Sequence, residues 1–282
     1  MNIEQLRKGI VDFCRRQIEK KQLPHWWRDP ILATAVADER FNILPGIAAP
    51  GHMLPRDLLP SCRTVVVFFI PFAPELTRGN IKGNFPSDDW GRSLSLTNDL
   101  IRDISEFIRV SLAKAGYTSE LTPATYNFDP ESLTARWSHK HLAHISGLGR
   151  FGINGQMITP SGCSGRLGSL VTETDLGEHP LVLNEDLCLH KAGQECLKCI
   201  RNCPVQAVTL NGILRQKCNQ RLQVNRKKFA ARPYMSEDME VCAKCVAGMP
   251  CSLTSPVPVS AVLNDDLPKI PGAAASRPGF LS

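Results

Sequence analysis

The sequence predicts an α+β protein, with a mixed α/β domain over residues 1–180 followed by a smaller, cysteine-rich domain over residues 181–260. Three observations support this prediction. Apolar residues recur at helical spacing near the N-terminus, and the β-branched and aromatic residues 64–72 have the pattern of a buried strand. Eight of the eleven cysteines then fall between Cys188 and Cys251. With 282 residues, 43% of them hydrophobic, the chain can form a substantial core.

Hydrophobic periodicity predicts the first elements of the N-terminal domain. Residues 2–22 have an apolar stripe at helical spacing and should form an amphipathic helix. Six prolines indicate loops between residues 24 and 60, and the run at 64–72 should be a central strand that is covered on both faces. Residues 94–115 predict a second long helix, which Gly116 should cap at its C-terminus.

The rest of this domain has weaker signals. We expect a strand at residues 117–128, a turn at Asp129-Pro130, a helix at residues 132–145 and another strand at residues 167–174. At the other end of the chain, residues 261–282 should form an irregular, proline-rich tail.

The spacing of the cysteines indicates iron–sulfur chemistry. Cys196, Cys199 and Cys203-Pro204 have the C-x2-C-x3-C-P spacing of a bacterial ferredoxin motif. Cys188 would replace the missing upstream cysteine through a five-residue insertion, and three further cysteines form a C-x2-C-x5-C group at residues 242–251. Together with an isolated Cys218 these residues supply eight thiolates, enough for two [4Fe-4S] clusters in a ferredoxin-like domain.

A cubane cluster takes one thiolate at each of four irons, and the cysteine before the proline ligates the other cluster in two-cluster proteins. We therefore assign one cluster to Cys188, Cys196, Cys199 and Cys251, and the other to Cys203, Cys218, Cys242 and Cys245. The alternatives are two zinc sites of four cysteines each, or disulfides. The Cys203-Pro204 step, followed by Ala207-Val208, favours iron–sulfur clusters over both.

The charge pattern suggests a partner, and the hydropathy argues against a membrane. The net charge is only +6, but residues 213–236 contain seven basic residues and no acidic residue. This segment is either a docking face, for an acidic electron donor such as a ferredoxin or flavodoxin or for RNA, or a solvated basic loop beside a negatively charged cluster. No apolar run approaches the ~18 residues of a membrane span, and the N-terminus lacks a signal core, so we expect a cytoplasmic protein.

Gly147, Gly149 and Gly152 match a G-x-G-x-x-G pattern, but the preceding residues are helical in pattern, which excludes a Rossmann fingerprint. These glycines either allow the backbone to approach a flat cofactor or form a tight turn. The histidines at positions 139, 141 and 144 do not share one helical face, so exposed or helix-capping roles are favoured over a metal triad. We interpret Cys163, far from the other thiols in sequence, as a spare loop thiol.

Two segments resemble the epoxyqueuosine reductase family. WSHKHLAHISGLGRFGING followed by GCSGRLGSLVT is similar to its AGLG…GKN…LG segment, and LLPSCRTVVVFFIPF is similar to its first core strand. The position of Cys218, and the return of Cys251 to the first cluster, also match that family. The resemblance covers residues 55–255 and extends to the reductive dehalogenases as more distant relatives.

The resemblance implies a cobalamin-binding N-terminal domain and two [4Fe-4S] clusters that carry electrons to it, with Gly147, Gly149 and Gly152 at the cofactor. It implies a small-molecule or modified-nucleoside substrate. The family's proton-donating aspartate lies in a D-x-x-P-x-x-E-R segment that this chain lacks, and Asp129 could replace it only across a four-residue insertion. The chain thus resembles a paralogue of that family whose substrate is unknown, rather than a true epoxyqueuosine reductase, and is expected to be an iron–sulfur oxidoreductase. The alternatives are a non-catalytic, ferredoxin-like electron-transfer protein and a zinc-stapled nucleic-acid-binding module.

Overall fold

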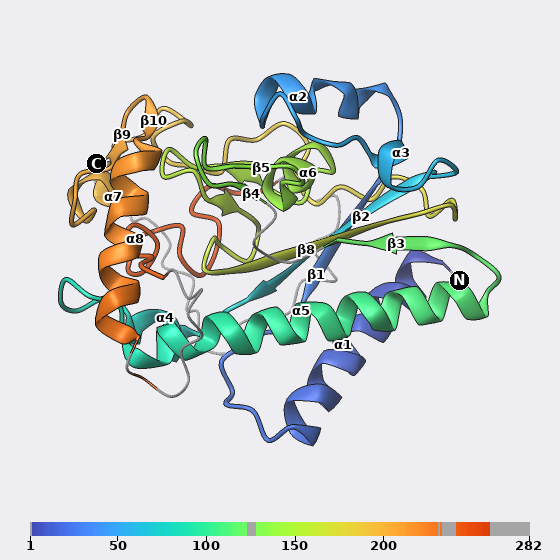
Figure 1. Cartoon of the computed structure of the whole chain (residues 1–282), viewed down its shortest axis with the longest axis horizontal. Coiled ribbons are helices and arrows are strands. Elements are labelled where there is room, and N and C mark those ends of the chain that lie inside the picture. The colour runs from blue at the N-terminus through green and yellow to red at the C-terminus, as the bar shows by residue number, and fades with distance from the viewer. Residues whose placement is uncertain (1, 123–127, 231, 233–240, 260–282) are drawn as a thin grey trace, which may run out of the picture.

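The structure, a computed structural model, describes residues 2–122, 128–230, 232 and 241–259. A four-stranded antiparallel sheet in the order β1-β2-β8-β3 forms its middle layer (Figure 1). The antiparallel pairing, with helices on both faces, confirms a mixed α+β fold. The strands are β1 Ile31–Val36, β2 Thr64–Pro71, β3 Ser119–Leu121 and β8 Gly165–Thr172.

Strand β2 is the centre of the sheet, and all eight of its residues are buried. Alternate side chains point to opposite faces of a strand. Accordingly, Val65, Val67 and Phe69 pack into one apolar cluster, whereas Val66, Phe68 and Ile70 pack into the other. The prediction of a central strand covered on both faces is confirmed.

The helices α1 Ile3–Lys20 and α5 Asp88–Lys114 cover one face of the sheet (Figure 1). Both predicted helices are confirmed, although α5 begins six residues before the predicted start because Ser87 caps it by accepting the N–H of Trp90. Gly116 follows the end of α5 in the left-handed region, with φ 85°, and the N–H of Tyr117 donates to the carbonyl of Leu112. This is the hydrogen bond of a Schellman motif, so the predicted glycine cap is confirmed.

The other face is covered by the 3-10 helix η1 Glu39–Ile43 and by α6 His139–Ile145, with α2 Leu44–Ile47 and α3 Pro55–Leu58 on the same side. The prediction of a loop-rich stretch over residues 24–60 is therefore wrong in part, because β1 lies within it. The alanines of β1 have little intrinsic preference for a strand. Pairing with β2, in the register Ile31↔Phe69, determines their conformation.

The helix predicted at residues 132–145 is wrong over its first half. Phe128–Asp129 (β4) and Thr134–Ala135 (β5) pair as a hairpin, with Leu133 at φ 54°, and α6 begins only at His139. The Asp129 carboxylate accepts the Ser132 N–H at 2.7 Å, so a local side-chain bond stabilises the turn. The predicted turn at Asp129-Pro130 is confirmed.

The remaining predictions differ in how they compare with the structure. The strand predicted at residues 167–174 is β8, and the one predicted at residues 117–128 is described only as β3, since residues 123–127 lie outside the described ranges. The predicted tail, residues 261–282, also lies outside them. The basic segment is not simply a loop, because most of its described residues form the helix α8 Arg215–Phe229. The other short elements are α4 Pro74–Gly79, β6 Arg150–Phe151, β7 Met157–Ile158, α7 Lys198–Arg201, β9 Val208–Thr209, β10 Gly212–Ile213 and α8 Arg215–Phe229.

The apolar cluster beneath α1 and α5 continues past residue 180 into the cysteine-rich segment. It includes Ile10 and Ile104 together with Val208, Val246 and Met249. Packing therefore joins the two predicted parts of the chain. Within the described part of the chain, no helix has both the length and the apolar character needed to cross a bilayer.

Candidate metal centre

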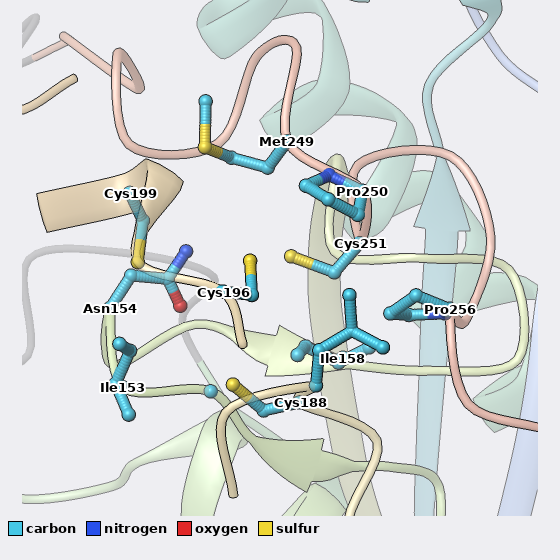
Figure 2. A pocket seen from close by; sticks show the side chains of 12 residues that line it. Ile153, Asn154, Ile158, Cys188, Cys196, Cys199, Met249, Pro250, Cys251 and Pro256 are labelled. Carbon is cyan, nitrogen blue, oxygen red and sulfur yellow. The ribbon is translucent and has the colours of Figure 1, made fainter. Parts of the chain in front are cut away.

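An open pocket with a free volume of ≈ 340 Å³, solvent-facing space included, lies between the cysteine-rich segment and the β6–β7 hairpin. Four of its lining residues are cysteines, and Figure 2 shows their side chains pointing into one space from different parts of the chain, with Cys199 on helix α7. Ile153, Ile158, Met249 and Pro250 supply apolar walls. The four cysteines are those that the sequence assigns to one cluster, namely Cys188, Cys196, Cys199 and Cys251.

The first group of thiols is also close enough for its members to interact electrostatically. Burial, together with the neighbouring thiols of Cys251, Cys188 and Cys196, raises the pKa of Cys199 to about 11. Cys188 and Cys199 are buried, and the other two are partly exposed. A set of four converging thiols with apolar walls is a donor set that suits an iron–sulfur cluster.

The second group, Cys203, Cys218, Cys242 and Cys245, comes from three separate segments of the chain. Cys218 lies in the first turn of α8, and its pKa is raised by burial and then by the thiols of Cys242 and Cys203. Burial raises the pKa of Cys245 to about 12, with contributions from Cys242, Cys218 and Cys203. The structure thus brings these four thiols into one neighbourhood.

Backbone hydrogen bonds also define the surroundings of the second group. The Ala207 N–H donates to the Cys203 sulfur at 3.1 Å. Ala243, between Cys242 and Cys245, has φ 56°, a conformation that costs an L-residue about 1–2 kcal/mol. Backbone strain of this kind is found where the surrounding structure has a functional geometry to maintain.

Three polar side chains attach the second group to the N-terminal part of the fold, and sequence reasoning missed all of them. The Asn154 amide donates to the carbonyl of Cys245 at 2.9 Å, and the Asn80 amide donates to the carbonyl of Cys242 at 3.0 Å. The buried ammonium of Lys244 donates to the carbonyls of Asn80 and Lys82. The only sequence signal was that Asn154 follows the glycine pattern and that Lys244 lies inside the C-x2-C motif.

Lys140 on α6 is a further residue that the sequence did not single out for a site. Its ammonium donates to the carbonyl of Gly155 at 3.1 Å, next to Asn154. Burial lowers the pKa of Lys140, whereas the nearby thiols of Cys245 and Cys218 act to raise it. The Lys140 amine therefore lies near the second group of thiols.

Cys163 is not the distant loop thiol that its sequence position suggested. Its Sγ lies 3.8 Å from the Sγ of Cys251, as donor to that sulfur. The shared proton raises the pKa of Cys163 and lowers that of Cys251. The fold brings together two cysteines that are 88 positions apart, which spacing alone could not indicate.

The three glycines of the G-x-G-x-x-G pattern lie against the chain's own atoms. A Cβ on Gly149 would lie 2.3 Å from the carbonyl oxygen of Ile158, and one on Gly147 would lie 2.5 Å from Pro180 Cβ. A Cβ on Gly152 would meet Asn154 Oδ1 at 2.7 Å. Internal packing accounts for glycine at these positions, and their contact with a cofactor stays a prediction.

Asp129 is exposed and its carboxylate is engaged locally. It accepts hydrogen bonds from the backbone of Glu131 and Ser132 and from the Ser132 hydroxyl, and those from Ser132 chiefly lower its pKa. A general acid that works near neutral pH needs a raised pKa. The geometry of Asp129 is that of a turn-forming residue, and its role as a proton donor stays a prediction.

The histidines near α6 are mostly internal rather than exposed. His139 is buried, with Nδ1 2.8 Å from the Ser169 hydroxyl. His52, which the sequence did not single out, accepts the Ser138 N–H through Nε2 at 2.8 Å, and its Nδ1 lies 2.7 Å from the Met53 carbonyl. His52 is therefore neutral with its proton on Nδ1, and it satisfies the N–H of Ser138, the N-cap residue of α6, which has no side-chain cap bond.

These histidines predict a loss of stability in acid. Burial lowers the pKa of His52 and His144, and it lowers that of His141 from 6.5 to about 4. Because the unfolded chain then binds more protons below pH 6.5, the free energy of unfolding should fall as the pH drops from 6.5 towards 4. His141→Asn should flatten the dependence of the urea midpoint on pH. His25→Gln, at an exposed position, is the matched control; equal slopes in wild-type protein and His141→Asn would contradict the prediction.

The thiols themselves bear on the alternatives to iron–sulfur clusters. All eleven cysteines lie in described ranges and none forms a disulfide. Over residues 2–122, 128–230, 232 and 241–259, no three His, Cys, Asp or Glu side chains are grouped closely enough to hold a single metal ion. A cubane cluster spreads its four ligands over four irons, so thiols that surround it lie farther apart than ligands of one ion.

Fold and site together define an α+β protein with a central antiparallel sheet and two groups of four thiols beside it. Neither a protein-family model nor a curated protein matches the sequence. Solved structures do: an epoxyqueuosine reductase superposes with a TM-score of 0.53 at 18% identity, over 89% of this chain and 66% of that chain. The enzyme from Bacillus subtilis gives 0.52 at 15% identity over the same shares.

A catabolic reductive dehalogenase gives a TM-score of 0.54 at 14% identity, over 80% of this chain and 30% of that chain. The chain thus spans just under two thirds of the length of the epoxyqueuosine reductases and under a third of the dehalogenase. At these identities the likeness is one of fold. The resemblance stated from the sequence is confirmed at that level.

Proposed function

We propose that this protein is an iron–sulfur reductase that binds two [4Fe-4S] clusters and delivers electrons to a substrate at its N-terminal domain. The observation that carries the proposal is the pocket in which Cys188, Cys196, Cys199 and Cys251 converge. The division into residues 1–180 and residues 181–260 is part of the proposal. The fold shared with reductases supports it.

In this proposal the first group of thiols holds one cluster and the second group holds the other. The clusters would store and transfer single electrons. The chain's own residues hold them by supplying deprotonated sulfurs, and the raised pKa values of Cys199 and Cys245, about 11 and about 12, mean that binding releases protons. Apolar side chains line part of the first pocket, and the Ala207 N–H donates a hydrogen bond to one sulfur of the second group.

Helix α8 supports an acidic electron donor, such as a ferredoxin or flavodoxin, as the partner. It carries Cys218 near its start and exposes Arg215, Lys217, Lys227 and Lys228. A basic surface beside a cluster ligand would steer an acidic protein towards the cluster and shorten the electron path. RNA is the alternative occupant of this surface.

The N-terminal domain is the proposed site of reduction. One of the similar epoxyqueuosine reductases is bound to a tRNA stem loop, and one dehalogenase is bound to 3-bromo-4-hydroxybenzoic acid. By analogy the substrate here is a small molecule or a modified nucleoside. Cobalamin is the candidate cofactor, although the glycines predicted to cradle it pack against the chain itself.

The second candidate function is electron transfer without catalysis. The packing of Gly147, Gly149 and Gly152 favours this candidate, because these glycines contact the chain's own atoms and so do not form an open cofactor site in the described part of the N-terminal domain. The zinc-stapled nucleic-acid-binding module stays the third, motivated by α8.

Anaerobic preparation of the full chain, followed by iron, sulfide, zinc and cobalt analysis, tests the proposal. We expect a brown protein with about eight irons and eight sulfides per chain. About two zinc ions and no visible absorbance would refute it. Titration with cob(II)alamin, followed by EPR, then separates the first two candidates, since a perturbed cobalt signal requires a binding site and an unperturbed one favours electron transfer alone.

A further inference from the structure

Cys163 lies directly behind one cysteine of the first pocket. Its side chain is 5% exposed, and its Sγ is 3.8 Å from the Sγ of Cys251. The residues that line the pocket include Cys251 but not Cys163. Cys163 therefore contacts a pocket sulfur from the protein side rather than the pocket side.

The backbone holds this contact in place. The Cys163 N–H donates to the carbonyls of Cys251 at 2.8 Å and of Ser252 at 3.1 Å, and the Ser164 N–H donates to Ser252 at 2.8 Å. Gly162, at φ 81°, allows this approach, because a Cβ there would lie 2.4 Å from the Ser252 carbonyl oxygen. The Thr159 hydroxyl donates to the carbonyl of Gly162 at 2.8 Å and closes the turn. Hydrogen bonds between the backbone segments 162–164 and 251–252 thus fix the two sulfurs relative to each other.

We propose that the Cys163 thiol donates a hydrogen bond to the Cys251 sulfur and thereby raises the reduction potential of the cluster held in the first pocket. This inference rests on the proposed function. Hydrogen bonds to ligand sulfurs are one of the factors that set iron–sulfur potentials. The reduced cluster carries one more negative charge than the oxidised cluster, so a donor stabilises the reduced form more. Cys163 is a positioning and tuning residue, and it is not a fifth ligand.

The test compares Cys163→Ala with Cys163→Ser in the full chain, prepared anaerobically and titrated by redox potentiometry with EPR detection. Alanine removes the donor, whereas serine retains one. Cys163→Ala should lower the reduction potential of the first cluster. At the midpoint potential of the wild-type cluster, the ratio of oxidised to reduced first cluster in this variant should therefore be about fivefold to tenfold higher than in wild-type protein. A tenfold change corresponds to about 59 mV for one electron. Cys163→Ser should keep the wild-type ratio or lower it, and the second cluster should keep its potential in both variants.

Cys62→Ala is the matched control, because Cys62 is equally buried but donates to the carbonyl of Thr64 instead. It should leave both potentials unchanged. Unchanged potential of the first cluster in Cys163→Ala would overturn the inference, and so would loss of that cluster's iron from both Cys163 variants, which would make Cys163 a ligand. Absence of clusters from the wild-type protein would instead overturn the proposed function, and with it this inference.

Discussion

Replacing Cys218 with alanine should remove one iron–sulfur cluster and leave the other in place. Cys218 is far in sequence from its partners, yet its thiol is in the electrostatic neighbourhood of Cys203 and Cys242. A cubane that loses one of four thiolates is strongly destabilised. The pocket of the first group contains no atom of Cys218, so that group should retain its cluster. We expect the iron content to fall from about eight to about four per chain.

Cys196→Ala is the reciprocal variant, because Cys196 lines the first pocket and belongs to the other group. Each reduced variant should show the EPR spectrum of its single remaining cluster, and the two spectra should differ. Their sum should match the wild-type spectrum apart from the features that arise from coupling between the two clusters. Full iron content in Cys218→Ala would show that Cys218 is not a ligand. Loss of all iron from both variants would show that the two clusters cannot be loaded separately, contrary to the assigned division.

Gly149→Val should prevent stable folding of the sheet domain rather than affect a bound cofactor alone. A Cβ at this position would lie 2.3 Å from the Ile158 carbonyl oxygen and 3.1 Å from the Met157 sulfur. The nearest neighbour is backbone of β7, which cannot rotate away as a side chain could. The free energy of unfolding, measured in urea, should fall by about 3 kcal/mol or more, which is the upper end of the usual cost of an overpacked site.

Gly51→Val is the matched control, since nothing lies within 4 Å of a Cβ at Gly51, and it should change stability little. A Gly149→Val protein with wild-type stability and full cluster content that fails to perturb cob(II)alamin would support the cofactor interpretation instead. Thermal unfolding followed by circular dichroism, alongside iron analysis, distinguishes the two results.

The elements that the sequence predicted well have strong local signals. Strand β2 is a continuous β-branched and aromatic run, and α5 combines a regular apolar stripe with Gly116 at its C-terminal cap. By contrast, β1 is short and alanine-rich, and its partner strand determines its conformation. The helix predicted at residues 132–145 was wrong over its first half. Its helical pattern could not show that the Asp129 carboxylate would accept the Ser132 N–H and stabilise a turn there.

For the site, the sequence by itself determined how many thiols there are and which of them lie at short ligand spacing, because such spacing is a local property of the chain; their division between two clusters is a prediction. Only the tertiary structure decided which of these thiols converge, since Cys188 and Cys251 approach through contacts between loops far apart in sequence. It also decided that Cys163 is a neighbour of Cys251 and that Gly149 packs on β7. The physical reason is that close approaches of this kind depend on the backbone hydrogen bonds and packing of the whole fold, which no spacing of residues encodes.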